Sequence, residues 1–344
     1  MDRDRKISNL RFNQDYGCFT SCMETGGVRV YNVDPLCEQA SIDVRTIGTI
    51  SICEMVYRTN LIGMVSGGCR PKYPDTTFLV FDHILNKFIL RLNFSHSIKA
   101  VRMKKDKLAI SLVKKIYIYS FPKMQILMCM DLRHNSQGIL EMTPMLNSER
   151  DIVVFPGCEV GALQMVYIKS TEVTQSSTPI SMKCHTNELS CIALNQDGSK
   201  VATTSEVGTI IRIWDTATTE QLLELRRGCD SALIYSLAFS SDSEYLCCSS
   251  DKGTVHIFAI SDTKLNKSMV LGRFLGKMGG PLKSFATFQL PPECACVCAF
   301  GTDNSVVAIG MDGSFNKYMF NIDGHCVRDV YDIFIDLVGT HMRS

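Results

Sequence analysis

Two adjacent arginines in the segment Leu225-Arg226-Arg227-Gly228 are the most distinctive chemical feature of the sequence. A guanidinium donates two hydrogen bonds in one plane, which suits the oxygens of a phosphate. Because successive side chains of a strand point to opposite faces, Arg226 and Arg227 in an extended strand would point apart. Gly228 leaves room for a close approach or an unusual backbone angle. The segment therefore predicts two anion sites, one on each side of a strand.

Hydroxyl, imidazole and further basic groups stand on both sides of this pair. The preceding residues of this kind, with one glycine among them, are His185, Thr203, Ser205, Gly208, Thr209 and Arg212. The following ones are Ser249, Ser250, Lys252, Thr254 and His256. Thr254 and His256 are two residues apart and would share one face of a strand. An alternative stays open, in which the arginines form a solvated strand end and the hydroxyls are turn formers.

Other chemistries find little support. The sequence contains no GxSxG, P-loop, HExxH or GxGxxG motif, and no carboxylate or nucleophile stands at a convincing spacing beside the two histidines. We therefore expect no enzymatic activity. The 16 cysteines lack zinc-site spacing and are expected to be free core residues, and no metal or cofactor is expected. The basic run from Lys99 to Lys115 has no aromatic stacking partners, which favours a solvated face over a nucleic-acid site.

A repeated pattern places these residues in an architecture. A turn followed by an alternating strand that carries an aromatic residue recurs seven times, at intervals of 38 to 62 residues. The aromatic residues are Tyr31, Phe81, Tyr119, Tyr167, Trp214, Phe258 and Phe320. This period is typical of propeller blades, each a small four-stranded sheet that cannot bury both faces alone. The sequence predicts an all-β fold, a single seven-bladed WD40-like β-propeller over residues 1–344.

The longest interval contains an insert, residues 261–284, in the sixth blade. Within it Leu271, Phe274, Leu275 and Met278 have the spacing of one helix face, and lysines and an arginine make the segment basic. Such a stretch favours an anionic membrane interface. Its glycines oppose a stable helix in water, so an irregular loop that orders only at a membrane is equally open.

Membrane contact of this kind would be peripheral. The net charge of +1 predicts no attraction of the whole molecule to membranes or nucleic acid, so anion binding must be local. The N-terminus is charged and lacks the apolar stretch of a secretory signal. No apolar run reaches the roughly 20 residues of a membrane span. A cytoplasmic location is expected.

The sequence resembles the PROPPIN (WIPI) family of WD-repeat propellers. LRRG is similar to the family's F/L-RRG motif, and HTNELSCIALNQDGSKVATTSEVGTIIRIWDT and SSDKGTVHIF resemble its flanking text. GGCRPKYPDTTFLVFD and CVCAFGTDNSVVAIGMDGSFNKYMFNIDGHCVRDVY are similar to the subgroup with LRRG. The resemblance implies a seven-bladed propeller that binds phosphatidylinositol 3-phosphate and 3,5-bisphosphate at two rim pockets. It also implies that the insert enters the bilayer.

Carried over to this sequence, the resemblance assigns residues to each pocket. The first pocket would contain His185, Thr203, Ser205, Thr209, Arg212 and Arg226. The second would contain Arg227, Gly228, Ser250, Thr254 and His256. Thr203 stands where the family often has Ser or Ala, and Leu225 replaces the phenylalanine of FRRG. Since position 225 alternates away from Arg226, the second change is expected to alter packing more than phosphate contact.

The resemblance further implies a monomeric adaptor in autophagosome formation, recruited from the cytoplasm to preautophagosomal and endosomal membranes. An autophagy-related lipid-transfer protein is the expected partner, at a surface of blades two and three near Lys72, Tyr73 and Pro74. No nucleic acid is expected. The competing hypothesis is a generic WD40 protein-interaction scaffold without lipid binding, because a propeller fold alone does not fix a function. A propeller hydrolase would lack a nucleophile system.

Overall fold

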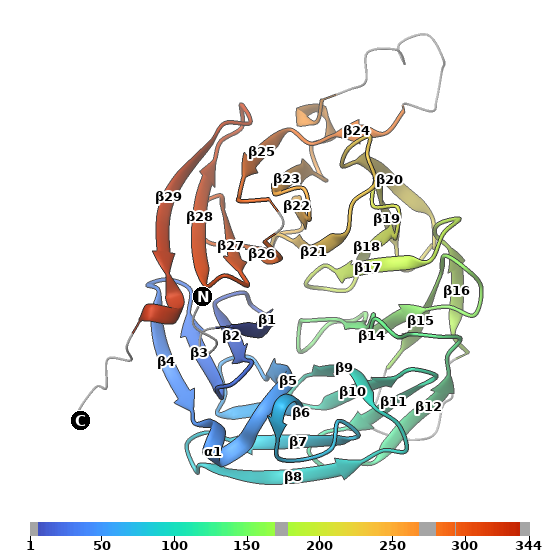
Figure 1. Ribbon diagram of the computed structural model, residues 1–344. Helices are drawn as coiled ribbons and strands as arrows, with labels where there is room; N and C mark the ends of the chain where they lie inside the picture. Colours follow the sequence, from blue (N-terminus) through green and yellow to red (C-terminus); the bar gives the residue numbers. More distant parts are fainter. Residues whose placement is uncertain (1–5, 169–177, 268–279, 293, 338–344) are drawn as a thin grey trace.

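The computed structural model describes residues 6–168, 178–267, 280–292 and 294–337. Seven antiparallel sheets stand around a central axis, each built from one continuous stretch of chain except for one added strand (Figure 1). We number these sheets blade 1 to blade 7 in chain order. The predicted seven-bladed β-propeller is confirmed.

The blades have the following strands. Blade 1 contains β1 (Ile7–Phe12), β2 (Cys18–Met23), β3 (Val28–Asn32) and β4 (Cys37–Ile42), and blade 2 contains β5 (Gly48–Met55), β6 (Leu61–Pro71), β7 (Thr77–Asp82) and β8 (Lys87–Asn93). Blade 3 contains β9 (Ile98–Met103), β10 (Lys107–Leu112), β11 (Lys115–Ser120) and β12 (Ile126–Asp131), and blade 4 contains β13 (Glu141–Met142), β14 (Ile152–Pro156), β15 (Ala162–Tyr167) and β16 (Ile180–Lys183).

The second half of the ring follows the same plan. Blade 5 contains β17 (Leu189–Leu194), β18 (Lys200–Ser205), β19 (Ile210–Asp215) and β20 (Gln221–Arg226), with β24 (Leu282–Lys283) added at its edge. Blade 6 contains β21 (Ile234–Phe239), β22 (Tyr245–Ser250), β23 (Thr254–Ala259) and β25 (Ala286–Gln289), and blade 7 contains β26 (Cys296–Phe300), β27 (Ser305–Gly310), β28 (Ser314–Phe320) and β29 (Cys326–Ile333). The described residues also contain three short helices outside the sheets: α1 (Val44–Ile47), η2 (Thr263–Leu265) and η4 (Phe334–Asp336).

The recurring aromatic residue of the sequence lies on the third strand of every blade. Apolar side chains alternate along these strands, so each sheet offers one apolar face to each neighbouring blade. Between blades 5 and 6, for example, Leu225, Phe239 and Phe258 are fully buried in one cluster. Burial of such a side chain contributes about 1.5–3 kcal/mol. The shared cores between blades are therefore what closes the ring.

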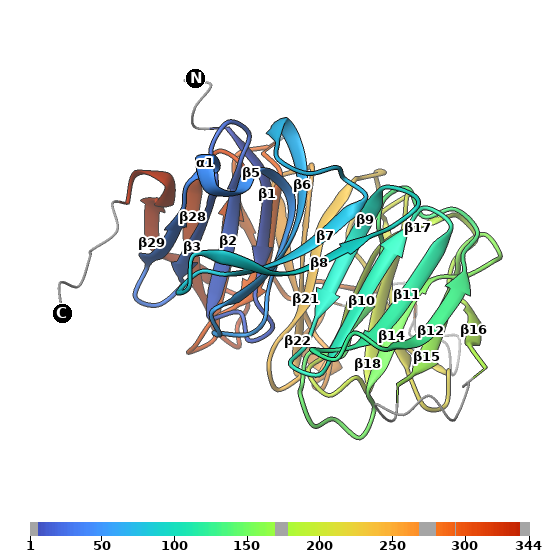
Figure 2. The same cartoon turned by 90° about the horizontal axis from the view of Figure 1, so that it is seen from below.

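Blades 7 and 1 lie next to each other (Figure 2) and share no strand among the described residues. Side chains join them instead. The rings of Phe19 and Tyr31 stack with centroids 4.9 Å apart, and Phe334 packs against both edge-on. Arg29 donates from Nη1 to the carbonyl of Ile335 at 3.0 Å. The segment after β29 thus fastens the last blade to the first.

Ion pairs join the innermost strands around the axis. Arg11, Glu54, Arg102 and Glu141 come from four successive blades, and Arg102 Nη2 lies 2.8 Å from Glu141 Oε1. Although burial opposes the shift, the charges of Arg102 and Arg11 lower the pKa of Glu141. Burial raises the pKa of Glu54, although the charges of Arg11 and Arg102 oppose this shift. The network links blades 1 to 4.

The basic run from Lys99 to Lys115 is only partly solvated, so the prediction of a solvated face is wrong for two of its lysines. Lys104 and Lys107 are buried, and their Nζ atoms each lie 2.9 Å from a carboxylate oxygen of Asp151. Their charges are neutralised within the fold and are not offered to a nucleic acid.

The cysteines behave largely as predicted. All 16 are free, and eight are buried. The Sγ atoms of Cys247 and Cys298 lie 3.4 Å apart within the core between blades 6 and 7. Burial of a thiol in such surroundings favours its neutral form, and burial raises the pKa of Cys184, Cys191 and Cys296 to about 12.

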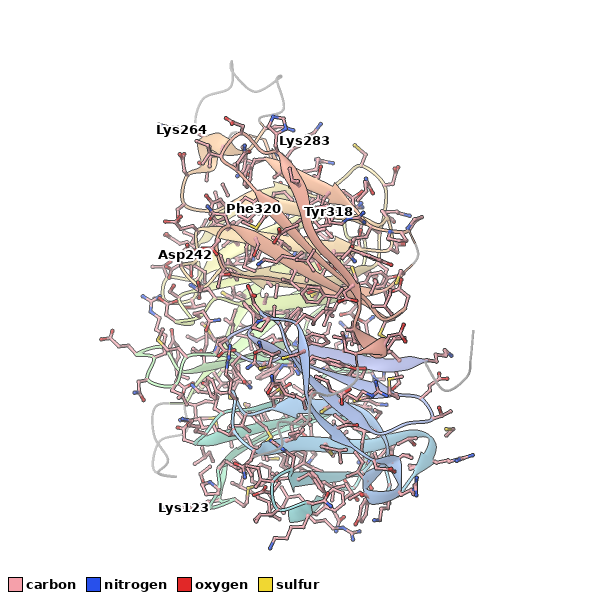
Figure 3. The ribbon with its side chains drawn as sticks, turned by 90° about the vertical axis from the view of Figure 1, so that its left-hand side faces the viewer. Lys123, Asp242, Lys264, Lys283, Tyr318 and Phe320 are labelled. Carbon is pink, nitrogen blue, oxygen red and sulfur yellow. The ribbon has the colours of Figure 1, made fainter. Side chains whose placement is uncertain are left out.

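The insert connects β23 to β25 within blade 6. Its described parts contain η2, which includes Lys264, and β24, which includes Lys283. Figure 3 labels both lysines. The predicted apolar residues Leu271, Phe274, Leu275 and Met278 lie outside the described residues. In the described part of the chain, no helix combines the length and apolar character needed to cross a bilayer.

Candidate anion-binding site

The two arginines lie at the end of β20, the outer strand of blade 5. β20 pairs with β19 so that Leu225 stands opposite Ile211 and Arg226 opposite Ile210. Leu225 is fully buried in the core between blades 5 and 6. Alternation therefore turns Arg226 to the opposite face, toward blade 4, and returns Arg227 to the blade 6 side. The predicted separation of the two guanidiniums is present.

Neither guanidinium has a carboxylate partner within 4.0 Å among the described residues. The Arg226 Nε atom is buried and has no hydrogen-bond partner there. Arg227 is 8% exposed, donates from Nε to the carbonyl of Gly208 at 3.0 Å, and donates from Nη2 to the carbonyl of Asp230. Unpaired buried charge is costly, so this arrangement favours an anion as the missing partner.

On the blade 4 side, the predicted residues Thr203 and His185 form a tight internal network with Trp214. Thr203 is fully buried, and its Oγ1 accepts from Trp214 Nε1 at 3.1 Å and lies 3.0 Å from His185 Nε2. His185 Nε2 also lies 3.2 Å from the Thr203 carbonyl, which requires a protonated Nε2. The Thr203 hydroxyl is therefore engaged within the fold. This network joins strands β18 and β19 to the loop that enters blade 5.

The charge of His185 follows from its surroundings. Burial, and then the charge of Arg212, lowers the pKa of His185 to about 4. The ring is therefore neutral at pH 7, and because its Nε2–H is bound to Thr203, its Nδ1 could donate to an anion only after protonation.

Arg212 is also engaged. It donates from Nε to Glu224 Oε2 at 2.8 Å and from Nη1 to the carbonyl of Cys184 at 2.7 Å. Arg212 and Glu224 are direct cross-strand partners on β19 and β20. An anion on this face would have to compete with Glu224 for Arg212, whereas Arg226 has no such competitor.

Ser205 and Thr209 were predicted for the same pocket as Arg226. Ser205 is buried at the end of β18, and its carbonyl accepts from Ser190 Oγ at 2.8 Å. The carbonyl of Thr209 accepts from the Arg227 N–H at 2.9 Å. Continuing the β19–β20 register by one residue sets Thr209 opposite Arg227, so Thr209 lies on the face of the second arginine.

On the blade 6 side, His256 is held by a residue that the sequence reasoning missed. Its Nδ1 lies 3.0 Å from Ser284 Oγ, on the segment that returns from the insert. Burial, and then the charge of Arg227, lowers the pKa of His256 to about 4. Arg227 is thus close enough to His256 to affect its pKa.

The remaining predicted residues of this pocket surround the same junction. Thr254 Oγ1 accepts from Gln289 Nε2 at 2.8 Å, and buried Ser250 accepts at Oγ from the Lys252 N–H at 3.4 Å. A methyl group added at Gly228 would meet no atom within 4 Å. Gly228 also has no positive φ, so open space next to Arg227, and not an unusual backbone angle, is what this glycine provides.

The PROPPIN family model matches residues 6–321 of the chain. The chain belongs to the PROPPIN family. A relative from Schizosaccharomyces pombe, SVP1-like protein 2, is 32% identical over 255 residues, covering 74% of this chain and 68% of the relative. Autophagy-related protein 18 of Dictyostelium discoideum is 28% identical over 345 residues, covering 91% of this chain and 88% of the relative.

Solved PROPPIN structures have the same fold. Kluyveromyces lactis Hsv2 superposes with a TM-score of 0.78 at 22% identity, covering 96% of this chain and 99% of that one. A complex of KlAtg21 with the coiled coil of AgAtg16 gives a TM-score of 0.77 at 23% identity, again with 96% and 99% coverage. The PROPPIN family comprises non-catalytic, autophagy-related propellers that bind phosphoinositides.

Proposed function

We propose that this PROPPIN binds phosphatidylinositol 3-phosphate and 3,5-bisphosphate at two rim pockets and serves as a membrane-recruited adaptor in autophagosome formation. One observation carries the proposal: two adjacent guanidiniums, without carboxylate partners in the described parts of the chain, face opposite sides of β20. Each would bind one phosphorylated headgroup through paired, charge-assisted hydrogen bonds.

In the first pocket Arg226 would be the principal phosphate ligand. Ser205 would add a polar contact, His185 would donate from Nδ1 once a bound phosphate favours its protonation, and Arg212 would join once it leaves Glu224. In the second pocket Arg227, Thr254 and His256 would bind the headgroup, with Ser250 and Thr209 beside them and with Gly228 leaving space for it. The carbonyl partners of Arg227 are neutral, so they orient its guanidinium without cancelling its charge.

The insert would supply the third membrane contact through Leu271, Phe274, Leu275 and Met278. Two headgroups and an inserted apolar segment are held on one rigid body. Once one contact forms, the effective concentration for the next is high, so weak individual contacts yield firm attachment. The protein would in this way be recruited peripherally from the cytoplasm to preautophagosomal and endosomal membranes.

The adaptor function also needs a protein partner. We propose an autophagy-related lipid-transfer protein, bound by a monomer of this chain at blades 2 and 3 near Lys72, Tyr73 and Pro74. Tyr73 is held there between Phe88, with ring centroids 5.4 Å apart, and Arg91, whose guanidinium lies 5.1 Å from the Tyr73 ring. Nearby Ile84 and Leu85 are 73% and 59% exposed, which favours a protein contact on these blades.

Flotation with liposomes across a phosphoinositide panel tests the lipid function. We expect wild type to float with the 3-phosphate and 3,5-bisphosphate, and Arg226→Ala/Arg227→Ala to stay in solution. The control Arg45→Ala/Arg58→Ala removes the same charge from exposed side chains elsewhere, 90% and 58% exposed, and should float normally. A folded Arg226/Arg227 variant that floats like wild type would favour the generic scaffold and refute the lipid sites.

A further inference from the structure

The segment that returns from the insert lies between the two proposed pockets. Its strand β24 pairs in parallel with β20, with Leu282 beside Leu225 and Lys283 beside Arg226. The N–H of Lys283 also donates to the carbonyl of Lys267 at 3.0 Å, which closes the base of the insert. A segment of blade 6 is thus fixed to the edge of blade 5, next to the arginine pair (Figures 1 and 3).

Alternation along this segment follows that of the arginines. Residues side by side on neighbouring strands point to the same face, about 5 Å apart. Leu282 packs with Leu225 in the core between blades 5 and 6, as this rule requires. Lys283 therefore shares the face of Arg226. It is exposed and has no carboxylate within 4.0 Å in the described parts of the chain.

The next residue turns to the other face. Ser284 is 8% exposed, and its Oγ lies 3.0 Å from His256 Nδ1. This contact fixes the imidazole plane and leaves Nε2 without a hydrogen-bond partner among the described residues, in a ring close enough to Arg227 for that charge to lower its pKa. The two residues Lys283 and Ser284 are thus divided between the two faces in the same way as Arg226 and Arg227.

We propose that the return segment of the insert supplies one residue to each headgroup pocket. Lys283 binds phosphate beside Arg226 in the first pocket, and Ser284 is a positioning residue that orients His256 in the second. The segment that anchors the insert is then part of both headgroup sites. This inference rests on the proposed lipid function and assigns it two further residues.

Titration calorimetry with water-soluble, short-chain phosphatidylinositol 3-phosphate, without a membrane, tests the inference. We expect Lys283→Met to weaken binding at one site by about tenfold, the usual effect of losing a charged hydrogen bond. Lys264→Met removes the same charge from η2, at the other end of the insert, and should bind like wild type. Normal binding by Lys283→Met in this assay would overturn the role of Lys283, even if its binding to vesicles fell.

Ser284 needs a readout that a merely structural residue would not affect. Ser284→Ala should weaken the other site several-fold, and Ser284→Thr, which keeps the hydroxyl, should restore it. Equal binding by Ser284→Ala and wild type, or a failure of threonine to restore a defect, would overturn the positioning role. If wild type itself bound no headgroup, or Arg226→Ala/Arg227→Ala bound normally, the proposed function would fall and this inference with it.

Discussion

The two faces of β20 both carry arginine, histidine and hydroxyl side chains, but these side chains differ in how far they are already bound to other protein groups. On the blade 4 side, Thr203, His185 and Arg212 are bound to other protein groups, whereas Arg226 keeps a buried donor that has no partner among the described residues. On the blade 6 side, Arg227 donates to two neutral carbonyls, which leave its charge uncompensated, and His256 is held by the hydroxyl of Ser284. Residue type alone therefore does not identify a ligand. A side chain already paired with Trp214 or Glu224 stabilises the fold, whereas an unpaired one can bind an anion.

The largest expected effect is a loss of folding stability, without a loss of headgroup affinity, in a variant of Thr203 on the blade 4 side. Thr203→Val removes the acceptor of Trp214 Nε1 and a partner of His185, and should lower the free energy of unfolding by about 2–4 kcal/mol. Headgroup affinity of the folded protein should change little. Urea denaturation and calorimetry measure the two quantities, and Thr302→Val, at an exposed position between β26 and β27 of blade 7, is the matched control. Normal stability with lost headgroup binding would make Thr203 a direct ligand.

We expect the protein to lose stability in acid because of His185 on the blade 4 side of β20 and His256 on the blade 6 side. Each has a folded pKa of about 4, below its ordinary value of 6.5, so between these values the unfolded chain binds a proton that the folded chain does not. Their contribution is complete above pH 6.5 and is lost as the pH falls toward 4, by up to about 3 kcal/mol each. Urea midpoints measured from pH 7 to 4.5 should fall less steeply in His256→Gln than in wild type. Equal slopes would show that His256 is not held neutral.

Substitution of Glu224 is expected to have a smaller effect of the opposite sign, a gain in headgroup affinity. Glu224→Gln should release Arg212 and remove a negative charge near the first pocket, so headgroup affinity there should rise by about three- to fivefold. Glu220→Gln, at an exposed position before the same strand, should change nothing. Calorimetry with the soluble headgroup measures both variants. Unchanged affinity in Glu224→Gln would place Arg212 outside the pocket.

The sequence predicted the features that depend on local pattern. Recurring aromatic residues identified all seven third strands, and alternation separated Arg226 from Arg227. The engagement of Thr203 depends on Trp214, which was recognised as a blade marker but not as a hydrogen-bond donor to the proposed pocket. The pairing of Arg212 with Glu224 could have been found from the register of the β19–β20 hairpin.

The return segment of the insert could not have been predicted. Its parallel pairing with β20 joins residues of different blades, more than 50 positions apart in the chain, through a two-residue strand. No periodicity is visible in so short a strand. Lys283 and Ser284 become notable only because folding sets them beside Arg226 and His256.

The stoichiometry of headgroup binding tests the central claim most directly. Titration of a water-soluble phosphatidylinositol 3-phosphate should give two sites per chain for wild type, one for Arg226→Ala, one for Arg227→Ala and none for the double variant. That result would establish one pocket on each face of β20. Two sites remaining in either single variant, or the loss of both sites in a folded single variant, would contradict the assignment of one arginine to each pocket.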